Sequence, residues 1–277
     1  MKKKAIEFKN IVKSYDGVNK VIDNLSLTVM SGELLTILGP SGCGKTTLLK
    51  MVNKLIAPDS GTILVNDIDI LDQDAIQLRR SIGYVIQQIG LLPHLTIKEN
   101  INYVLSIMKT DPAFKEKKAL ELIETVGLSA EYLTRYPRQL SGGQKQRIGV
   151  ARALAADPEI ILMDEPFGAV DEITRSLLQD ELLRIQKKLN KTILFVTHDI
   201  QEALKLGTRI VLINQGQIEQ VGSKEDLIFR PNSEFVKDFF GIKGFKATLD
   251  NQVMRTVYKR LLSGEETLTD LYRKLDG

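Results

Sequence analysis

The stretch GPSGCGKTT at residues 39–47 follows the apolar run ELLTIL and merges into KTTLLKMVNKL, which has the pattern of a helix. It fits the pattern G-x-x-x-x-G-K-[ST], in which a glycine-rich loop joins a buried strand to a helix. The backbone N–H groups of such a loop close around the α- and β-phosphates of a nucleotide. Lys45 reaches the β/γ oxygens and Thr46 offers its hydroxyl to Mg²⁺. An ordinary glycine-rich turn would not need this strand and helix on either side, so we predict a phosphate loop.

Strand-like and helix-like runs alternate on both sides of this loop. AIEFKNIVKSY and VIDNLSLTVM before it predict two antiparallel strands, and TILVN after it predicts another. Residues from about 88 to 157 have mostly helical patterns, among them one helix over residues 97–108 and another in PAFKEKKALELIETVGL. Beyond them, EIILMDEP and TILFVTHD predict buried strands on either side of a helix over residues 172–189, and RIVLINQGQIEQVG predicts a hairpin. The sequence therefore predicts an α/β fold with a mainly parallel core sheet, an N-terminal antiparallel β subdomain and a helical insert.

Polar side chains follow two of the predicted buried strands. Asp164 and Glu165 follow four apolar residues in IILMDEP, and His198 ends the strand in FVTHD. Because α/β sheets bind ligands at the carboxyl ends of their strands, we expect these residues to lie together. Asp164 can hold Mg²⁺, Glu165 can polarise the attacking water, and His198 can contact the γ-phosphate. His94, in the polar turn LPHLT, has no such context and is interpreted as structural.

A second anion-binding helix start is predicted at LSGGQ, residues 140–144. Ser141 and Gln144 have the spacing of a capping box, and KQRIGVARALAA behind them has a helical pattern. Gly142 and Gly143 leave the first backbone N–H groups of that helix uncovered, which favours an anion there. The sequence therefore predicts two phosphate sites almost a hundred residues apart.

Composition limits the class of protein. The chain has 277 residues, of which 43% are hydrophobic, which suits one elaborated domain or a domain with an appendage. With 38 basic and 35 acidic residues, the net charge of +3 does not suggest a nucleic-acid binder. No apolar stretch approaches the roughly 20 residues of a membrane helix, so no membrane-spanning helix is expected. The polar segment AIEFKN stands where a signal peptide would have its apolar core, so we do not expect a secreted protein. The single cysteine, Cys43, fits a reducing cytosol and is interpreted as a small residue of the loop.

The phosphate loop, the acidic pair and LSGGQ together resemble the nucleotide-binding subunits of ABC transporters, over about residues 4–240. The resemblance implies an ABC-type P-loop NTPase that hydrolyses ATP with Mg²⁺. In that family LSGGQ binds the γ-phosphate held by the opposite subunit's phosphate loop, so two chains pair head to tail around two nucleotides. A dimer that ATP closes and hydrolysis opens is a mechanical switch. The resemblance therefore explains the second phosphate site.

The resemblance also assigns roles one residue at a time. Tyr15 in KSYDG matches the aromatic residue that stacks on adenine, although an ordinary strand tyrosine is the simpler interpretation. Gln87, six residues before Pro93, matches the Q-loop glutamine that contacts Mg²⁺ and the attacking water, with Gln88 as the alternative. Asp171 in GAVD matches the D-loop aspartate at the dimer interface, where the family commonly has Ser-Ala-Leu-Asp. The predicted site thus has catalytic Glu165, His198, Gln87 and Lys45; nucleotide contacts Tyr15, Gly39, Pro40, Ser41, Gly42, Cys43, Gly44, Lys45, Thr46, Thr47, Ser141, Gly142, Gly143, Gln144 and Asp171; and Mg²⁺ ligands Thr46, Gln87 and Asp164.

Longer motifs narrow the resemblance. GPSGCGKTTLLKMVNKLIAPDSGTI, IGYVIQQIGLLPHLTI and ILMDEPFGAVDEITRSLLQDEL are similar to subunits that import quaternary-amine osmoprotectants such as glycine betaine, carnitine and choline. This similarity implies integral-membrane permease subunits, a second nucleotide-binding subunit forming a homodimer, and an extracellular or periplasmic solute-binding protein, with no nucleic acid. It also implies a peripheral place on the cytoplasmic face of the cell membrane.

The last residues differ from the predicted domain of residues 1–240. Residues 241–277 predict two short amphipathic helices, VMRTVYKRLL and LTDLYRKL. Many members of the osmoprotectant group carry a C-terminal pair of CBS domains, for which these residues are too few. Either this chain lacks that regulation or it is truncated.

Other members of the superfamily are alternatives. DNA-maintenance ATPases insert a very long coiled coil where this chain has a compact helical insert, and ribosome-binding members normally carry two ATPase heads. A binding module without activity is disfavoured because Glu165 is present. Some exporters use separate ATPase subunits, so an exporter, or an importer of another small solute, remains an alternative.

Overall fold

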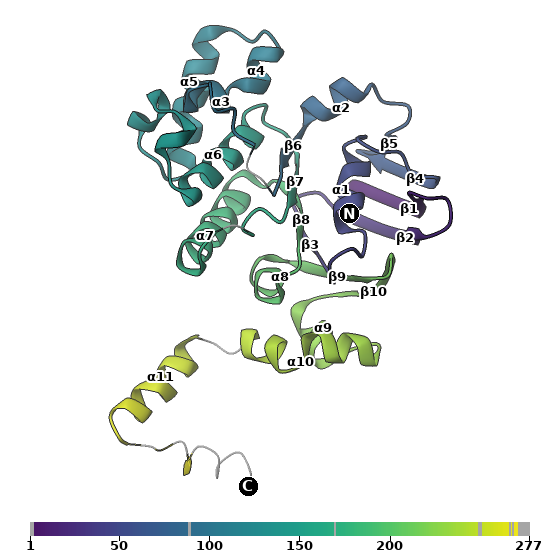
Figure 1. Cartoon of the computed structure of the whole chain (residues 1–277), viewed down its shortest axis with the longest axis vertical. Coiled ribbons are helices and arrows are strands. Elements are labelled where there is room, and N and C mark those ends of the chain that lie inside the picture. Colours follow the sequence, from purple (N-terminus) through teal and green to yellow (C-terminus); the bar gives the residue numbers. More distant parts are fainter. Residues whose placement is uncertain are drawn as a thin grey trace.

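Runs of branched apolar residues form two β-sheets that flank the phosphate loop (Figure 1). The computed structural model describes residues 3–87, 90–168, 170–248, 251–265, 267, 269 and 270. The strands are β1 (Lys4–Ser14), β2 (Lys20–Met30), β3 (Leu34–Leu38), β4 (Ser60–Val65), β5 (Ile68–Asp69), β6 (Ile82–Val85), β7 (Ile160–Asp164), β8 (Thr192–Thr197), β9 (Arg209–Asn214) and β10 (Gln217–Gly222). The helices are α1 (Lys45–Val52), α2 (Ala75–Ser81), α3 (Ile97–Ile101), α4 (Tyr103–Ile107), α5 (Pro112–Thr125), α6 (Gly142–Leu154), α7 (Glu172–Leu189), α8 (Ile200–Leu206), α9 (Lys224–Phe229), α10 (Glu234–Thr248) and α11 (Asn251–Leu262), with 3₁₀ turns η1 (Ala130–Thr134) and η2 (Pro137–Gln139).

The larger sheet has the strand order β10-β9-β3-β8-β7-β6, and β10 is the strand that pairs antiparallel. The smaller sheet, β2-β1-β4-β5, is antiparallel. Every residue of β3, β7 and β8 is buried, as expected where elements cover both faces of a parallel sheet. The predicted α/β fold, with its parallel core sheet and N-terminal antiparallel sheet, is confirmed.

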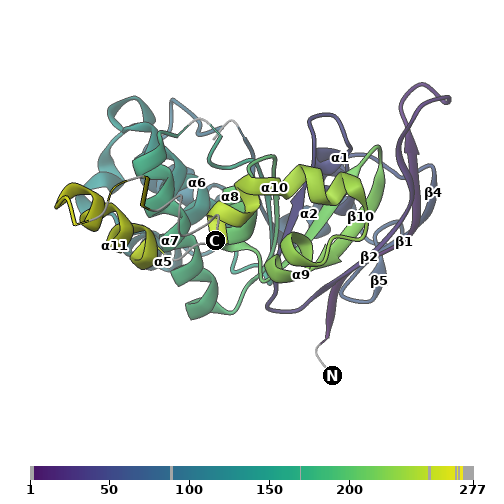
Figure 2. The same cartoon turned by 90° about the horizontal axis from the view of Figure 1, so that it is seen from below.

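Successive residues of the core strands pack into different hydrophobic clusters because side chains alternate across a strand. Ile160 and Leu162 of β7 pack with α1 and the N-terminal sheet, whereas Ile161 and Met163 pack with helices α3, α5, α6 and α7. Figure 2 shows the antiparallel strands and the helical insert on opposite sides of the core sheet. The core sheet therefore fixes the phosphate loop relative to the helix that begins at LSGGQ.

Two predicted helices differ from the observed ones. The single helix expected over residues 97–108 is two helices, since Asn102 ends α3 and begins α4, and its buried amide donates to the Lys115 carbonyl at 2.9 Å. The helix expected over residues 45–55 ends at Val52, because Asn53 caps it and Lys54 adopts a left-handed φ of 48°. In addition, α2 and β6 were not predicted.

The C-terminal helices cover one corner of the core sheet. Leu38, Ile210 and Leu212 pack with residues of α8, α9 and α10, among them Phe240. Helix α10 is broken at Gly241, with φ 41° and ψ −144°, and α11 lies beyond it at the lower end of Figure 1. α11 matches the predicted helix VMRTVYKRLL, whereas LTDLYRKL lies almost wholly outside the described residues.

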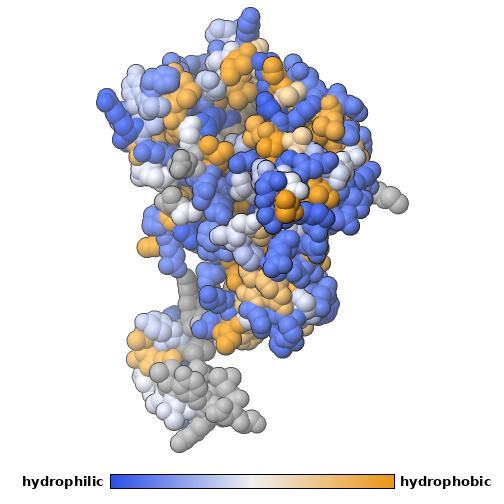
Figure 3. Space-filling model, turned by 45° about the vertical axis from the view of Figure 1, so that its right-hand side comes forward, coloured by the Kyte–Doolittle hydropathy of each residue, from blue (hydrophilic) through white to orange (hydrophobic). Residues whose placement is uncertain are grey.

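Hydrophobic side chains on the face drawn in Figure 3 form small groups among hydrophilic ones. None of the helices in the described part of the chain combines the length and hydrophobicity that a membrane crossing requires.

Candidate functional site

Four neighbouring parallel strands end at the same edge of the core sheet. The register pairs Leu38 of β3 with Thr197 of β8, Asp164 of β7 with Val196 of β8, and Val85 of β6 with Met163 of β7. The loops that follow these strands therefore meet along one edge, where α/β sheets bind ligands. The phosphate loop follows β3, and His198 follows β8. The acidic pair lies at the end of β7, and Gln87 follows β6.

The phosphate loop requires glycine at two positions for different reasons. A Cβ on Gly39 would lie 2.1 Å from the Ile213 carbonyl oxygen, so only glycine fits beside β9. Gly44 has φ 101°, a conformation that L-residues rarely adopt, and it caps α1. Between them Pro40, Ser41 and Gly42 are exposed. The loop thus presents backbone N–H groups and the start of α1 to solvent, as a phosphate site needs.

Lys45 is buried and bonded to the loop itself. Its Nζ donates to the carbonyl oxygens of Gly39 at 2.9 Å and Pro40 at 2.8 Å. A bound nucleotide could exchange these carbonyls for phosphate oxygens.

Burial raises the pKa of the neighbouring Cys43 thiol, which therefore stays protonated and unreactive at neutral pH. This agrees with Cys43 being a small residue of the loop.

Thr46 and Asp164 are adjacent and suit a magnesium ion. Thr46 Oγ1 donates to Asp164 Oδ1 at 2.8 Å. Neighbouring ligands of an octahedral Mg²⁺ lie about 2.9 Å apart, since each Mg–O distance is about 2.0–2.1 Å. Burial raises the pKa of Asp164, the Thr46 hydrogen bond opposes this, and the Glu165 carboxylate raises it further. A divalent cation would relieve the burial of this carboxylate, so these residues fit the ion.

Glu165 lies between two other predicted site residues. Its Oε1 is 3.0 Å from His198 Nδ1, and its Oε2 accepts from Gln87 Nε2 at 3.1 Å. Glu165 has a left-handed φ of 42°, held by a hydrogen bond from its N–H to the Val196 carbonyl. Strained backbone of this kind is concentrated at functional sites. The carboxylate is thereby fixed between groups from β6 and β8, while Gln88, the alternative Q-loop residue, lies outside the described residues.

Tyr15 presents an exposed ring next to the phosphate loop. The side chain is 62% exposed, and its hydroxyl is 3.2 Å from Thr47 Oγ1 on α1. Lys13 Nζ lies 5.9 Å from the ring centroid. A largely exposed ring that is held at its hydroxyl end can stack on an aromatic base.

The LSGGQ segment begins α6 with the predicted capping box. Ser141 Oγ accepts from the Gln144 N–H at 3.3 Å, and Gln144 Oε1 accepts from the Ser141 N–H at 2.9 Å. A Cβ on Gly143 would lie 2.5 Å from Thr174 Cγ2, so the segment contacts the start of α7. Asp171 caps α7 by accepting from the Thr174 N–H, which lowers the pKa of its carboxyl. LSGGQ and the D-loop therefore lie together.

The helix that begins at LSGGQ is separated from the phosphate loop of the same chain. Figure 1 shows α6 within the helical insert and α1 on the other side of the core sheet. The LSGGQ segment is thus not placed to complete its own chain's phosphate site.

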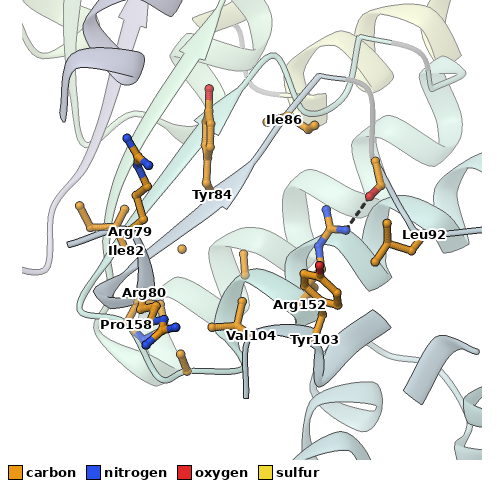
Figure 4. Close-up of a pocket in the computed structure, with 14 residues that line it drawn as sticks. Arg79, Arg80, Ile82, Tyr84, Ile86, Leu92, Tyr103, Val104, Arg152 and Pro158 are labelled. Atoms are coloured by element: carbon orange, nitrogen blue, oxygen red, sulfur yellow. Dashed lines mark hydrogen bonds between the residues drawn. The ribbon is translucent and has the colours of Figure 1, made fainter. Parts of the chain in front are cut away.

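A groove of about 310 Å³ lies between the core sheet and the helical insert (Figure 4). Leu92, Tyr103 and Val104 line it on the side of the insert, and Arg79 and Ile82 line it on the other side. Arg152, near the end of α6, donates to the Gly90 carbonyl at 2.7 Å, drawn as a dashed line in Figure 4. The groove is therefore built on the segment that follows Gln87.

Comparisons with known proteins find similar chains and a similar fold. The family model described as ABC transporter matches residues 22–168. The choline transport ATP-binding protein OpuBA of Bacillus subtilis is 52% identical over 236 residues, which are 85% of this chain and 62% of that protein. The osmoprotectant import ATP-binding protein OsmV of Salmonella typhimurium is 56% identical over 223 residues, 80% of this chain and 58% of that protein. The chain thus spans about three-fifths of the length of these curated relatives. The dimeric structure of a bacterial ABC transporter cassette matches with a TM-score of 0.70 and 37% identity, covering 79% of this chain and 98% of that one.

Some contacts at the site were not anticipated from the sequence. The strand β6, which carries Gln87 to Glu165, is only four residues long and contains Gly83. Its signal was the short apolar run IGYV. Arg175, Glu202 and Thr197, which surround the loops of Asp171 and His198, were not singled out either, since isolated polar residues on amphipathic helices are ordinary.

Proposed function

The chain belongs to the ABC transporter family, and we propose that it is the ATP-hydrolysing subunit of an importer for a small quaternary-amine osmoprotectant. The observation that carries the hydrolytic part is the placement of Glu165. Its carboxylate is bonded to Gln87 and His198 beside the Thr46–Asp164 pair, at the edge of the sheet where the phosphate loop also lies. A general base, γ-phosphate contacts and candidate magnesium ligands thereby converge on one place.

The residues divide the reaction between them. Lys45 exchanges its bonds to Gly39 and Pro40 for β/γ-phosphate oxygens and neutralises their charge. Thr46, Asp164 and Gln87 would hold Mg²⁺, which supplies further positive charge at the phosphates when bound. Glu165 accepts a proton from water as the water oxygen bonds to the γ-phosphorus. The bond from that phosphorus to the β–γ bridging oxygen breaks, and ADP and phosphate leave.

Two copies are needed to complete the nucleotide sites in this proposal. LSGGQ and Asp171 lie together on one chain, and LSGGQ starts a helix across the core sheet from that chain's own α1. A second copy in head-to-tail arrangement would bring its Ser141, Gly142 and Gly143 to the γ-phosphate on the first. The related cassette of 37% identity was solved as a dimer, which supports this arrangement.

The groove of Figure 4 is the proposed contact for an integral-membrane permease. Leu92 lines this groove, whereas Leu91 packs against the hydrophobic core. Arg152, near the end of α6, donates to the Gly90 carbonyl, so α6 contacts the chain that follows Gln87 beside the groove. This would place the chain peripherally at the cytoplasmic face of the membrane.

The solute class and the solute-binding partner rest on the named relatives. The names of the two curated relatives describe choline transport and osmoprotectant import, and both proteins exceed 50% identity to this chain. We therefore propose a quaternary amine as the solute and an extracellular or periplasmic binding protein as a component of the complex.

Two experiments test these proposals. The purified chain should hydrolyse ATP in the presence of Mg²⁺, and Lys45→Ala should lower kcat by at least about 10²-fold, as expected when a charge that stabilises the transition state is removed. Lys187→Ala, at an exposed position on α7, is the matched control. Cells that lack the chain should lose uptake of radiolabelled glycine betaine, carnitine or choline. Loss of a different solute's uptake instead would replace the solute class, and loss of efflux would favour an exporter.

A further inference from the structure

A buried polar network lies against the loop that carries His198. Glu202 on α8 is 4% exposed and Gln179 on α7 is 6% exposed. Glu202 Oε2 accepts from Thr197 Oγ1 at 2.6 Å, and Glu202 Oε1 accepts from Gln179 Nε2 at 3.3 Å. Thr197 directly precedes His198. The buried carboxylate therefore holds the end of β8 from which the histidine extends.

Arg175 connects the same loop to the D-loop. Its Nη2 donates to the Val170 carbonyl at 2.9 Å, and Val170 directly precedes Asp171. Its Nη1 lies 3.5 Å from Asp199 Oδ2, and Asp199 directly follows His198. One guanidinium thus touches the residue before the D-loop aspartate and the residue after the γ-phosphate histidine.

The network is costly for a purely structural element. Burial raises the pKa of Glu202, and the nearby Asp199 carboxylate raises it further, against the hydrogen bonds from Thr197 and Gln179. Apolar residues of similar volume usually serve packing at least as well as a buried carboxylate such as that of Glu202 with its partly exposed partner Arg175. In addition, Arg175 Nε is buried without a hydrogen-bond partner in the described part of the chain and lies 4.0 Å from Glu202 Oε1. The Arg175 charge lowers the pKa of Glu202, so the two side chains interact across the loop that carries His198.

We propose that Arg175 and Glu202 are positioning residues for His198, which link its loop to the D-loop so that a second copy docked at Asp171 sets where the histidine lies. This rests on the proposed function for the identity of the docked partner and of the γ-phosphate. The chemical consequence is that hydrolysis becomes efficient when the partner is in place, because the contact at Val170 and Asp171 is transmitted to His198.

The chain offers a direct probe because it has two histidines. In the full chain labelled with ¹³C-histidine, the ring Cε1–H signals of His198 and His94 can be assigned with His94→Gln. Arg175→Ala should move the His198 signal and leave that of His94, in the distant turn before α3, unchanged. Arg184→Ala removes the same charge from the same helix, where it bonds to Glu181 and the Thr125 carbonyl, and should move neither signal.

Kinetics supply the second readout. Arg175→Ala should lower kcat for ATP hydrolysis about 10- to 10²-fold, because displacement of a site residue by about 1 Å can cost that much. KM for ATP should stay within about twofold, since phosphate-loop contacts are untouched. Arg175→Lys should give an intermediate kcat, because a single ammonium group cannot span both the Val170 carbonyl and Asp199 as a guanidinium does.

A folded Arg175→Ala chain whose His198 signal stays in place would overturn the proposal. If thermal melts show that this variant does not fold, Glu202→Gln decides, since it keeps the side-chain shape but places an NH₂ group against Thr197 or Gln179. It should move the His198 signal and lower kcat, and an unchanged signal overturns the proposal. The NMR readout needs no ATPase activity, so failure of the positioning proposal is distinguishable from failure of the proposed function.

Discussion

Replacing Glu165 with glutamine should separate nucleotide binding from hydrolysis. The glutamine oxygen can accept from Gln87 Nε2 as Glu165 Oε2 does at 3.1 Å, and its NH₂ group can donate to an unprotonated His198 Nδ1, now 3.0 Å from Glu165 Oε1. Both contacts are kept, so the free energy of unfolding should change by no more than about 0.5 kcal/mol. Lys45, Thr46 and Asp164 are untouched, so ATP and Mg²⁺ should still bind.

The expected loss lies in the chemical step. An amide cannot accept the proton of the attacking water, and a positioned base contributes about 10²–10⁴-fold to a rate. At about 1.4 kcal/mol for each factor of ten, the variant should lose roughly 3–5 kcal/mol of transition-state stabilisation. Unhydrolysed ATP would remain between phosphate loops and opposing LSGGQ segments, so ATP should shift the chain toward a dimer by mass action.

Single-turnover assays measure the hydrolysis rate, and titration measures ATP binding. Size-exclusion chromatography with ATP measures dimer formation. The control is Glu225→Gln, at an exposed position on α9 remote from the site. Hydrolysis by Glu165→Gln at the control's rate would refute the assignment of the base. A variant that binds ATP yet stays monomeric at every protein concentration would refute the ATP-held dimer.

Three further outcomes follow from individual contacts. Asp164→Asn removes a carboxylate whose pKa burial raises, so at pH 7 the nucleotide-free variant should be more stable than wild type by on the order of 1 kcal/mol, roughly 2–4 °C in Tm. The folded state holds a proton on Asp164 more tightly than the unfolded state does, so the destabilisation of the wild type by this carboxylate disappears as pH falls through the raised pKa. Melts from pH 8 toward 4 should therefore show the difference in Tm between variant and wild type closing, and a widening difference would contradict the cause given. Gly39→Ala puts a Cβ 2.1 Å from the Ile213 carbonyl and should cost about 1–3 kcal/mol in urea unfolding, whereas Gly142→Ala, with open space around its Cβ, should cost much less. Leu92→Asp should reduce uptake in cells while the purified chain keeps its ATPase rate, with exposed Leu71→Asp as control; full uptake by a well-folded Leu92→Asp variant would remove the groove from permease docking.

The features predicted from the sequence are those with local signals. The apolar runs of β3, β7 and β8 are buried on both faces, and such strands are continuous in hydrophobicity. The phosphate loop was recognised by its glycines. In the structure Gly39 has no room for a side chain beside β9, and Gly44 adopts a positive φ. The meeting of Asp164, Glu165 and His198 at one edge followed from parallel pairing. These three features could be predicted from short sequence patterns, the chain direction and the alternation of strands and helices.

The remaining features depend on contacts between distant segments. Asn102 breaks the predicted helix because its amide bonds to the Lys115 carbonyl on α5, a partner that helical periodicity cannot indicate. The contact between Gln87 and Glu165 requires β6, whose four residues give too short a pattern to distinguish a strand from a loop.

Mixing two inactive variants tests most directly the central claim, that ATP is hydrolysed between two copies of this chain. Lys45→Ala removes the phosphate-loop charge and Ser141→Arg blocks the LSGGQ segment. In a mixed head-to-tail dimer one site carries both substitutions and the other carries neither. An equal mixture should therefore recover up to about a quarter of the wild-type rate, since random pairing makes half of the dimers mixed and each has one intact site. No recovery in a mixture where mixed dimers are demonstrated would show that each chain uses its own LSGGQ segment, and would contradict the account.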